Sequence, residues 1–346
     1  MKTVFVGLSG GVDSSVAALR LKKQGYNVVG VFIKVWHPDF MVCNWEQERL
    51  DAMRVAAHLE IPFLTCDAEA TYKQEVADYF IAEYQAGRTP NPDVMCNKAV
   101  KFGAFLRFAQ AHGADYIATG HYVQKIDGRL HKGVDATKDQ SYFLWTLTTE
   151  QLEQALFPIG DTTKQSIRRE AEAAGIPVAT KKDSQGICFL GHVDIADFLS
   201  HYIELAPGDV LSTSGEVIGS HQGALIYTIG QRHGFTIDSK GAEKTPHYVV
   251  SKSIEDNTIT VSTDFEAEKR EGDMVLCDIV LRQFLQEGEM LTAHFRYHGP
   301  DITCKVTKVD KQSLVLLPAL PTHLPAKGQS VVLYEGTHCI GGGIVT

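Results

Sequence analysis

Leu8-Ser9-Gly10-Gly11-Val12-Asp13-Ser14-Ser15 follows a short apolar run, Val4-Phe5-Val6, and precedes a segment with apolar residues at helical spacing, 16–23. This order predicts a strand, a tight turn and a helix whose apolar face packs on a sheet. Gly10 and Gly11 let the backbone approach a ligand where a Cβ would collide. The serine hydroxyls and the N–H groups of the helix N-terminus add hydrogen-bond donors. The stretch is therefore predicted to bind an anion such as phosphate.

The spacing of this loop separates it from other phosphate-binding loops. It lacks the Gly-Lys-Ser/Thr ending of a Walker A loop and the Gly-x-Gly-x-x-Gly spacing of a dinucleotide fold. The pattern Ser-Gly-Gly-x-Asp-Ser resembles the loop of the PP-loop ATP pyrophosphatases. That resemblance implies a loop that holds the pyrophosphate of ATP during adenylation. An ordinary strand–turn–helix junction that contains glycines is the alternative.

Composition sets broad limits on the protein. The chain has 346 residues, of which 44% are hydrophobic and 22% are charged, so two or three domains are expected. It has neither an apolar run of about 20 residues nor a signal sequence, so a cytoplasmic location without membrane contact is expected. Seven widely spread cysteines do not fit a disulfide framework, and no zinc-type spacing occurs, so no structural metal is expected.

The charge pattern bears on possible partners. A net charge of −9 argues against indiscriminate nucleic-acid binding, although a local basic patch could still bind a polynucleotide. Lys98, Lys101 and Arg107 form one candidate patch. A second candidate patch contains Lys164, Arg168, Arg169, Lys181 and Lys182. Solvated helix faces are the alternative for both.

Strand-like and helical segments alternate through the first half of the chain. Strands are predicted at 26–36, 63–66 and 116–122, and helices at 45–59, 71–85, 98–111 and 163–174. The helix at 45–59 is expected to present Leu50, Met53 and Ala57 on one face. This alternation predicts an α/β fold with a doubly wound parallel sheet covered on both faces. In such sheets ligands bind beyond the carboxyl ends of the strands, where the opening loop would lie.

The pattern changes near residue 207. Short alternating strands and frequent turns predict a β-rich central domain and then a C-terminal β-barrel. The expected domains are 1–206 for the catalytic PP-loop domain, 207–270 for the central domain and 271–346 for the barrel.

Two of the seven cysteines, Cys96 and Cys188, stand in polar loops. Cys66, Cys277, Cys304 and Cys339 lie in apolar, strand-like settings typical of core residues, and Cys43 is ambiguous. The two prolines of 87–97 predict an extended segment, with Cys96 directly before a helix. A helix N-terminus and the nearby Lys98 would lower the pKa of the Cys96 thiol, and Asp93 could exchange a proton.

Several motifs together resemble the bacterial tRNA-specific 2-thiouridylase family, in order and over essentially the whole chain. They are Thr89-Pro90-Asn91-Pro92-Asp93-Val94-Met95-Cys96-Asn97, Ala118-Thr119-Gly120-His121-Tyr122, Lys138-Asp139-Gln140-Ser141-Tyr142, Asp183-Ser184-Gln185-Gly186-Ile187-Cys188-Phe189, Tyr227-Thr228-Ile229-Gly230-Gln231-Arg232, Arg296-Tyr297 and Gly341-Gly342-Gly343. Two features depart from the family. Gln185 stands where many relatives have a small residue, and the loop His37-Pro38-Asp39-Phe40 is shorter and less acidic, which leaves its role open.

The resemblance implies a role for each matching residue. Cys188 would carry sulfur as a persulfide, Cys96 would be its partner, and Asp93 would assist proton transfer. ATP would be bound by Gly7, Leu8, Ser9, Gly10, Gly11, Val12, Asp13, Ser14, Ile33 and Gly120. Asn91, Pro92 and Asp93 would meet the target base, and the other tRNA contacts would be His121, Lys138, Asp139, Gln140, Arg296, Tyr297 and Gln329.

The implied reaction is an ATP-dependent adenylation of the C2 oxygen of the wobble uridine of tRNA, followed by sulfur transfer. The base would leave the anticodon stack to reach the site, and Mg²⁺ is expected with ATP although no ligand set is legible. The implied partners are tRNA and a persulfide donor such as a cysteine desulfurase or a sulfur-relay protein. The order of sulfur attack and Cys96–Cys188 disulfide formation stays open, and a loop is expected to move so that the two cysteines meet.

Two other functions fit parts of the pattern. A PP-loop ligase or amidotransferase acting on a small metabolite would use the opening loop, with incidental cysteines. A non-catalytic sulfur carrier or RNA-binding protein would use the cysteines, with a vestigial loop.

Overall fold

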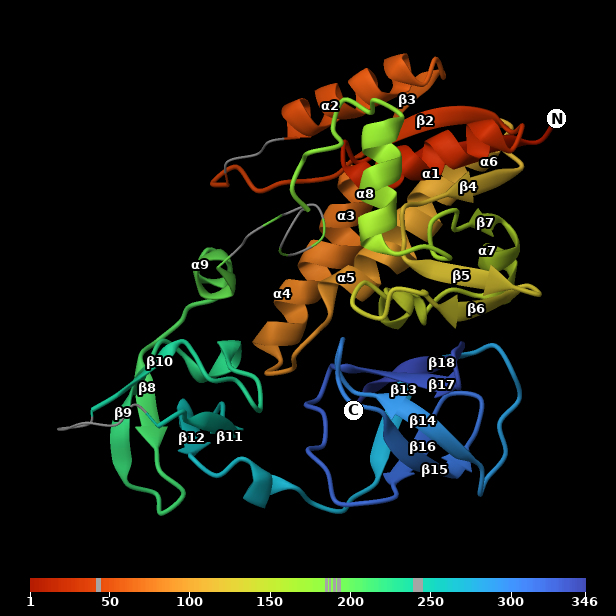
Figure 1. The fold of residues 1–346 in the computed structure, drawn as a ribbon. Coiled ribbons are helices and arrows are strands. Elements are labelled where there is room, and N and C mark those ends of the chain that lie inside the picture. Colours follow the sequence, from red (N-terminus) through yellow and green to blue (C-terminus); the bar gives the residue numbers. More distant parts are fainter. Residues whose placement is uncertain (42–44, 184–185, 187, 189–190, 192–193, 239–244) are drawn as a thin grey trace.

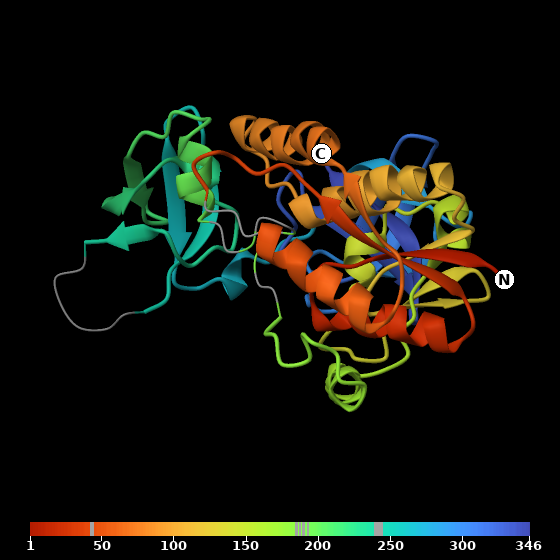
Figure 2. The same ribbon diagram turned by 90° about the horizontal axis from the view of Figure 1, so that it is seen from above.

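The computed structural model describes residues 1–41, 45–183, 186, 188, 191, 194–238 and 245–346. The chain forms three bodies, each built around its own sheet (Figures 1 and 2). The N-terminal body carries a five-stranded sheet, the central body another five-stranded sheet, and the C-terminal body an eight-stranded one. Among the helices within these ranges, none has the length and apolar composition needed to cross a membrane.

The N-terminal sheet is parallel, as predicted. Its strand order is β3-β2-β1-β4-β7, and every neighbouring pair runs in the same direction. The chain winds outward from β1 to β3 and then returns to the other side of β1, so β1 and β4 flank the point where the winding reverses. The strands are β1 Thr3–Gly7, β2 Asn27–Lys34, β3 Phe63–Asp67, β4 Tyr116–Ala118 and β7 Ala155–Leu156.

Helices cover both faces of this sheet because its strands are apolar on both sides. Alternate residues of β1 divide between two cores: Val4 and Val6 pack with α1, α2 and α8, whereas Phe5 packs with the helices on the opposite face. The helices of the first face are α1 Val12–Lys23, α2 Trp45–His58 and α8 Lys164–Ala173. The second face is covered by α3 Glu69–Tyr72, η1 Lys73–Ala77, α5 Pro92–Met95, η2 Cys96–Ala104 and α6 Phe105–Ala111. The helix α4 Asp78–Gln85 continues from η1 and packs in a separate core with Phe198 and Leu199.

The predicted inner face of α2 is wrong. Leu50 and Met53 are 40% and 39% exposed, and Ala57 is exposed too. The buried stripe instead contains Asp51, Ala52, Val55 and Ala56. Both stripes have helical spacing, but the buried one carries small side chains that allow close approach to the sheet. Asp51 makes this stripe more polar in the sequence than the stripe of Leu50 and Met53. In the structure its carboxylate pairs with Lys181 at 2.8 Å.

The prediction that 87–97 is extended is wrong from Pro92 onward, whereas the segment before it is not helical and Asn91 is extended. Pro92 begins α5, a position where its missing N–H costs no hydrogen bond. The Asn91 side chain caps this helix by accepting hydrogen bonds from the N–H groups of Asp93 and Val94. The π-helical segment η2 and then α6 follow without a break, so Cys96 lies inside a helical run rather than before its start.

The two later bodies are β-rich, as predicted. The central sheet has the order β10-β9-β8-β12-β11, and its strands are β8 Gly208–Leu211, β9 Val217–His221, β10 Phe235–Ile237, β11 Tyr248–Ser253 and β12 Thr258–Ser262. In the C-terminal sheet, pairing of β13 with β18 closes six strands into a barrel. These are β13 Met274–Leu281, β14 Met290–His294, β15 Ile302–Val309, β16 Leu314–Pro318, β17 Ser330–Glu335 and β18 His338–Val345.

A hairpin from the first half of the chain extends the barrel sheet. Its strands are β5 Val123–Ile126 and β6 Arg129–Lys132, and β6 pairs with β18. The short elements η3 Ser141–Leu144 and α7 Thr149–Glu153 follow in the N-terminal body, while α9 Ile195–Ser200 leads to the central body, which also carries η4 Ala224–Ile226 and η5 Glu266–Glu268. The N-terminal body therefore shares secondary structure with the barrel.

The four cysteines expected in the core are not all fully buried. Cys66, Cys304 and Cys339 are buried as predicted, but Cys277 is only half-buried on β13. Cys43 lies outside the described residues.

Candidate functional site

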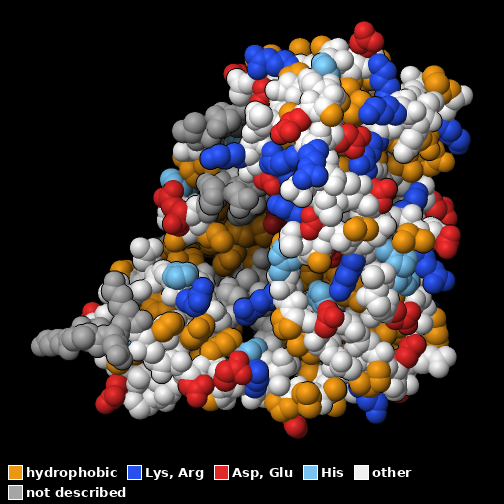
Figure 3. All heavy atoms as spheres, viewed as in Figure 1, with side chains coloured by type: hydrophobic (Ala, Val, Ile, Leu, Met, Phe, Trp, Pro, Cys, Tyr) orange, Lys and Arg blue, Asp and Glu red, His pale blue; other side chains and the backbone are white. Residues whose placement is uncertain are grey.

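A cavity of about 1190 Å³ opens beyond the carboxyl ends of β1 and β4. Apolar side chains are visible in the hollow between the N-terminal and central bodies, and lysines and arginines gather over α8 above it (Figure 3). The residues predicted to bind ATP line this cavity with the exception of Gly10. They are Gly7, Leu8, Ser9, Gly11, Val12, Asp13, Ser14, Ile33 and Gly120.

The opening loop folds into a tight cradle. Gly10 has a φ of +71°, and a Cβ there would lie 2.6 Å from the carbonyl oxygen of Glu48. Gly11 is the N-cap of α1 and has no side chain to cap it, so the first N–H groups of the helix face the cavity without a side-chain cap. The hydroxyls of Ser9 and Ser14 lie 3.3 Å apart at the same place. These donors suit an anion.

The loop after β4 completes the cradle from the other side. A Cβ on Gly120 would lie 2.7 Å from the backbone nitrogen of Ser14. Only glycine therefore lets β4 approach the loop this closely. The two predicted ATP segments, far apart in sequence, are brought together as the sheet topology requires.

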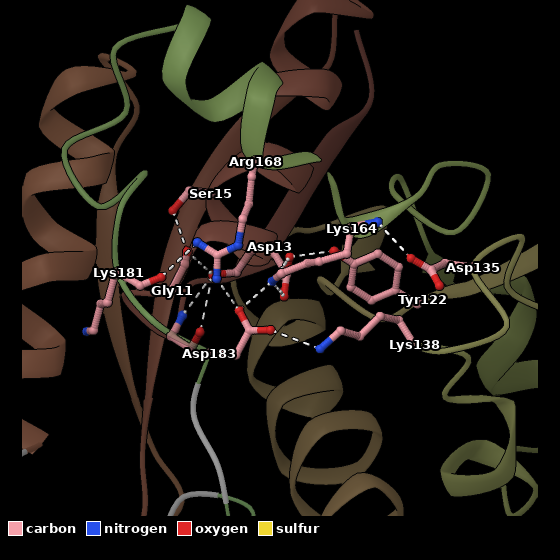
Figure 4. Close-up of polar contacts among 12 residues, drawn as sticks. Gly11, Asp13, Ser15, Tyr122, Asp135, Lys138, Lys164, Arg168, Lys181 and Asp183 are labelled. Atoms are coloured by element: carbon pink, nitrogen blue, oxygen red, sulfur yellow. Dashed lines mark hydrogen bonds and ion pairs between the residues drawn. The ribbon is translucent and has the colours of Figure 1, made fainter. Parts of the chain in front are cut away.

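A cluster of charges adjoins the cradle (Figure 4). The Lys164 ammonium lies 2.8 Å from both carboxylate oxygens of Asp13, and the Tyr122 hydroxyl donates to one of them at 2.7 Å. Lys164 also lies 2.7 Å from Asp183, which Arg168 and Lys138 contact at 2.5 and 3.0 Å. Burial raises the pKa of Asp183, but hydrogen bonds from Lys164 and Lys138 outweigh it and lower the pKa to about 2. The sequence marked Lys164 and Arg168 only as a possible basic patch.

Two cysteine sulfurs lie next to each other at the wall of this cavity: Cys188 lines the cavity, and Cys96 is buried behind it. The Sγ atoms of Cys96 and Cys188 lie 3.3 Å apart although 92 positions separate them in the chain. The Cys188 backbone is held on both sides. Its N–H donates to Asp93 Oδ1 at 2.8 Å, and its carbonyl accepts from the Tyr72 hydroxyl at 3.0 Å. The predicted proximity of the two cysteines is therefore present in this structure. Ser184, Gln185, Ile187 and Phe189 of the same motif lie outside the described residues.

The two thiols differ in acidity, in the opposite sense to the prediction for Cys96. Complete burial, and then the hydrogen bond to Cys188, raise the pKa of Cys96 well above its usual range. Its sulfur lies inside the helical run and not at the helix N-terminus that was expected to lower the pKa. A hydrogen bond from Cys96 and the nearby Lys101 ammonium lower the pKa of Cys188 to about 7 against the effect of burial. Cys188 is thus the sulfur that carries negative charge near neutral pH.

Asp93, Asn97 and Lys101 lie four residues apart on the helical run and line one wall of the cavity. Burial raises the pKa of Asp93, partly opposed by the Cys188 N–H and by Lys101, which suits a group that gives and takes a proton. Burial lowers the pKa of Lys101, but Cys188 and Cys96 raise it more, so its ammonium stays charged. Sequence reasoning placed Lys101 only in a candidate basic patch and predicted no role for it in the chemistry.

His121 is a neutral imidazole in this wall. Burial and then the charge of Lys101 lower its pKa well below the usual value. Its Nε2 lies 3.5 Å from the Lys101 ammonium, and its Nδ1 lies 2.7 Å from the Thr119 hydroxyl. Because an ammonium can only donate, Nε2 accepts and the Nδ1–H donates to Thr119.

The residues predicted to contact tRNA fall into two groups. Asp93, His121, Lys138, Gln140 and Tyr297 line the cavity. The remaining five are placed elsewhere: Asn91 caps α5, Pro92 begins it, Asp139 accepts from Ser141, Arg296 donates to the Ile229 carbonyl, and Gln329 accepts from the Ala326 N–H.

Aromatic rings stand at two walls of the cavity. Phe143 and Tyr297 lie 4.4 Å apart between ring centroids, and His298 stacks on Tyr297 at 3.9 Å. On the other wall, Phe40 stacks on His201 at 3.6 Å. The loop 37–40, whose role the sequence left open, thus contributes His37 and Phe40 to the cavity wall.

The described residues do not supply a dedicated metal site. No group of three or more His, Cys, Asp or Glu side chains that could hold a metal ion occurs among them. Asp13, the acidic residue of the opening loop, has both oxygens paired with Lys164. The arrangement favours an anion over a bare cation.

Family models match the three bodies in turn. They are described as a tRNA methyl transferase HUP domain at residues 2–192, a tRNA methyl transferase PRC-barrel domain at 196–263 and an aminomethyltransferase beta-barrel domain at 279–345.

Full-length relatives carry a different name from these models. A tRNA-specific 2-thiouridylase from Streptococcus thermophilus is 45% identical over 355 residues, covering 99% of this chain and 94% of the relative. The enzyme of that name from Bacillus cytotoxicus is 45% identical over 351 residues with the same coverage.

Solved structures match a smaller part of the chain. A 4-thiouridine synthetase–RNA complex with bound ATP gives a TM-score of 0.36 at 20% identity, covering 58% of this chain and 50% of that chain. The NMN synthetase of Francisella tularensis gives 0.34 at 17% identity, covering 53% and 66%. With TM-scores this low, neither structure defines the fold of this chain. The identity to full-length relatives is decisive, and the chain belongs to the tRNA-specific 2-thiouridylase family.

Proposed function

We propose that this protein replaces the C2 oxygen of the wobble uridine of tRNA by sulfur, using ATP and a persulfide on Cys188. One observation carries the proposal: Cys188 lines the same cavity as a phosphate-binding loop, and its sulfur lies 3.3 Å from the sulfur of the buried Cys96. A site that only activates oxygen does not need the sulfur pair. Conversely, a sulfur carrier does not need the loop.

The loop would serve the first half of the reaction. The C2 oxygen of uridine attacks the α-phosphorus of ATP, an O–P bond forms, and the bond to the β-phosphate breaks to release pyrophosphate. Gly7 to Ser14 with Ile33 and Gly120 would hold the nucleotide, and their N–H and hydroxyl donors would stabilise the charge of the leaving group. Mg²⁺ would be bound mainly by phosphate oxygens and water, because Asp13 is already paired with Lys164.

The cysteines would serve the second half. In one order, the Cys96 thiolate attacks the inner sulfur of the Cys188 persulfide, a Cys96–Cys188 disulfide forms, and the released hydrosulfide attacks C2 and displaces AMP. In the other order, the terminal sulfur attacks C2 first and Cys96 then cleaves the S–S bond. Both orders end in a disulfide that a two-electron thiol reductant must reopen. Asp93 would take the proton released from sulfur or from the base.

The remaining proposals concern tRNA and the sulfur source. The wall residues Asp93, His121, Lys138, Gln140 and Tyr297 would contact the extruded base and its neighbours. Further contacts to tRNA would come from predicted residues outside the cavity, namely Asn91, Pro92, Asp139, Arg296 and Gln329. We assign residues 1–206 to catalysis. The two later domains, 207–270 and 271–346, would bind tRNA. The persulfide would come from a cysteine desulfurase or a sulfur-relay protein, in the cytoplasm.

Mass spectrometry of anticodon nucleosides tests the proposal. Unmodified tRNA is incubated with the protein, ATP, Mg²⁺ and a persulfide donor, and the uridine is expected to gain the mass of an oxygen-to-sulfur exchange. Methyl transfer, suggested by the names of the family models, would give a different mass. Cys96→Ala and Cys188→Ala are each expected to abolish thiolation while ATP binding survives. Normal thiolation in either variant would exclude the two-cysteine mechanism.

Pyrophosphate release separates the other functions. A ligase acting on a small metabolite would release pyrophosphate with that metabolite and ignore Cys188→Ser. A sulfur carrier would release none under any condition.

A further inference from the structure

The carboxylate of Asp183 is surrounded by three cations. Lys164 and Arg168 contact Oδ1 at 2.7 and 2.5 Å, and Lys138 contacts Oδ2 at 3.0 Å (Figure 4). Ion pairs of this kind are strong because both partners are charged and hydrogen-bonded. Asp13 and Asp135 also adjoin these cations, so the charges are balanced, and a further anion would bind here by replacing a carboxylate.

This cluster is joined directly to the opening loop. The Lys164 ammonium lies 2.8 Å from both oxygens of Asp13, which belongs to the first turn of α1. Before this turn, in the loop itself, the Gly10 carbonyl accepts from Lys181 at 3.1 Å. The cations therefore lie at the edge of the place where the phosphates of ATP would be held.

Asp183 stands between the cavity and these cations. It lines the cavity, whereas Lys164 and Arg168 are not among the lining residues, and the Lys164 side chain is only 12% exposed. Because Asp183 lines the cavity and contacts Lys164, a phosphate group that took the place of this carboxylate would contact Lys164. Carboxylate and phosphate oxygens accept from ammonium and guanidinium groups in similar geometry, so one can replace the other.

We propose that Lys164 and Arg168 bind the leaving pyrophosphate of ATP, and that Asp183 occupies their anion position until the phosphates replace it. Without this carboxylate, Arg168 would lose the acidic group that it contacts, and Lys164 would keep only its contact with Asp13 in the nucleotide-free protein, at a cost in stability. The low pKa of Asp183 keeps it charged throughout the neutral range, so protonation does not remove this competition. The inference rests on the proposed binding of ATP at the opening loop.

Two other roles for Asp183 predict different effects on ATP binding. If Asp183 is a ligand of ATP-bound Mg²⁺, its removal would weaken ATP binding. If Asp183 is only a structural link, its removal would leave ATP binding unchanged. An Asp183→Asn variant therefore discriminates by the sign of its effect on ATP affinity.

The experiment measures ATP and pyrophosphate binding to the full-length protein by titration calorimetry with Mg²⁺. Asp183→Asn is expected to bind both about tenfold more tightly, since no carboxylate has to be displaced, and to melt at a lower temperature without nucleotide. Lys164→Met is expected to bind both about tenfold more weakly, and Lys164→Arg is expected to recover most of the affinity. Thermal melts show whether each variant is folded.

Glu170→Gln is the matched control. Glu170 pairs with Arg20 at 2.7 Å and so links the same two helices, α8 and α1, away from the cavity. This variant is expected to lose stability while its ATP affinity stays within about twofold of the wild type. Unchanged or weaker ATP binding by Asp183→Asn, or unchanged binding by Lys164→Met, would overturn the inference. If the wild type binds no ATP, the proposed function itself fails, which is a distinct result.

Discussion

At the scale of single residues, the surroundings of Cys96 and Cys188 give two chemically identical thiols different acidities. Cys96 is fully buried and keeps its proton, while Cys188 lies beside the Cys96 S–H and the Lys101 ammonium, which stabilise its thiolate. A nucleophile or persulfide carrier needs the charged form, and a resolving thiol can remain protonated until its partner reacts. The structure therefore fits a persulfide on Cys188 better than one on Cys96.

The pH dependence of alkylation tests this difference. A Cys188 pKa of about 7 means that the thiolate fraction rises as pH increases through 7 and is nearly complete one to two units higher. The rate of iodoacetamide labelling, followed on the Cys188 peptide by mass spectrometry, is expected to show this midpoint. Cys277, also half-buried but with a pKa raised by burial, is the internal control and should react only at higher pH.

Substitution of the neighbours should move that midpoint. Cys96→Ala removes the hydrogen bond that stabilises the thiolate, and Lys101→Met removes the nearby positive charge, so both are expected to raise the midpoint. An unchanged midpoint in both variants would mean that neither neighbour controls the acidity of Cys188.

At the scale of elements, the short helix α5 aligns Asp93 with Cys188. The Asn91 side chain caps the helix, and Asp93 in its first turn accepts from the Cys188 N–H at 2.8 Å. Asn91→Ala is expected to cost about 1 kcal/mol of stability and to slow thiolation, because the position of Asp93 depends on the cap. Asn91→Ser keeps an acceptor and should behave almost like the wild type. Equal melting temperatures and rates for the two variants would contradict the role of the cap.

The opening loop depends on its glycines in a way that two substitutions separate. Gly10 and Gly25 both have positive φ, at +71° and +86°, but only a Cβ on Gly10 would meet backbone, 2.6 Å from the Glu48 carbonyl oxygen. Gly25→Ala should cost only the left-handed strain, about 1 kcal/mol, and leave ATP binding intact. Gly10→Ala should also displace the loop and lower ATP affinity at least tenfold by titration calorimetry. Similar ATP affinities in both variants would refute this distinction.

These elements show what the sequence could and could not predict. The parallel sheet, most helix limits and the position of the opening loop follow from local apolar periodicity and glycine spacing, which Val4 to Leu19 display clearly. The helix predicted from Lys98 is an exception, because it begins at Pro92. The inner face of α2 was mispredicted because Asp51 is buried against Lys181, a partner 130 residues away. The same limit applies to the site. Lys101 belongs to the site because it lies beside Cys188, and Lys164 because it contacts Asp183. A local sequence pattern cannot predict contacts between residues so far apart in the chain.

At the scale of the whole molecule, the barrel and the N-terminal body are joined by more than the chain. The hairpin β5–β6 pairs with β18 of the barrel. The Tyr142 hydroxyl of the N-terminal body donates to the Ser330 carbonyl of the barrel at 3.0 Å. The hydroxyls of Ser141 and Tyr334 are hydrogen-bonded at 3.1 Å. Arg282 of the barrel follows β13, and its guanidinium donates to the buried carbonyls of Trp145 and Leu147, each at 2.8 Å. The barrel also contributes Tyr297 and His298 to the cavity wall, so the site contains residues from both bodies.

Arg282→Met therefore tests whether the two bodies fold as one unit. The substitution leaves buried carbonyls without their donor, at a cost of about 2–4 kcal/mol concentrated at the junction. In calorimetry, the wild type is expected to unfold its barrel and N-terminal body in one transition, and Arg282→Met is expected to split that transition in two. Arg296→Met is the matched control, since Arg296 of the same barrel donates to the Ile229 carbonyl of the central body instead. The role of Arg282 would be excluded if the wild type unfolded in two separate transitions. It would also be excluded if Arg296→Met split the transition and Arg282→Met did not.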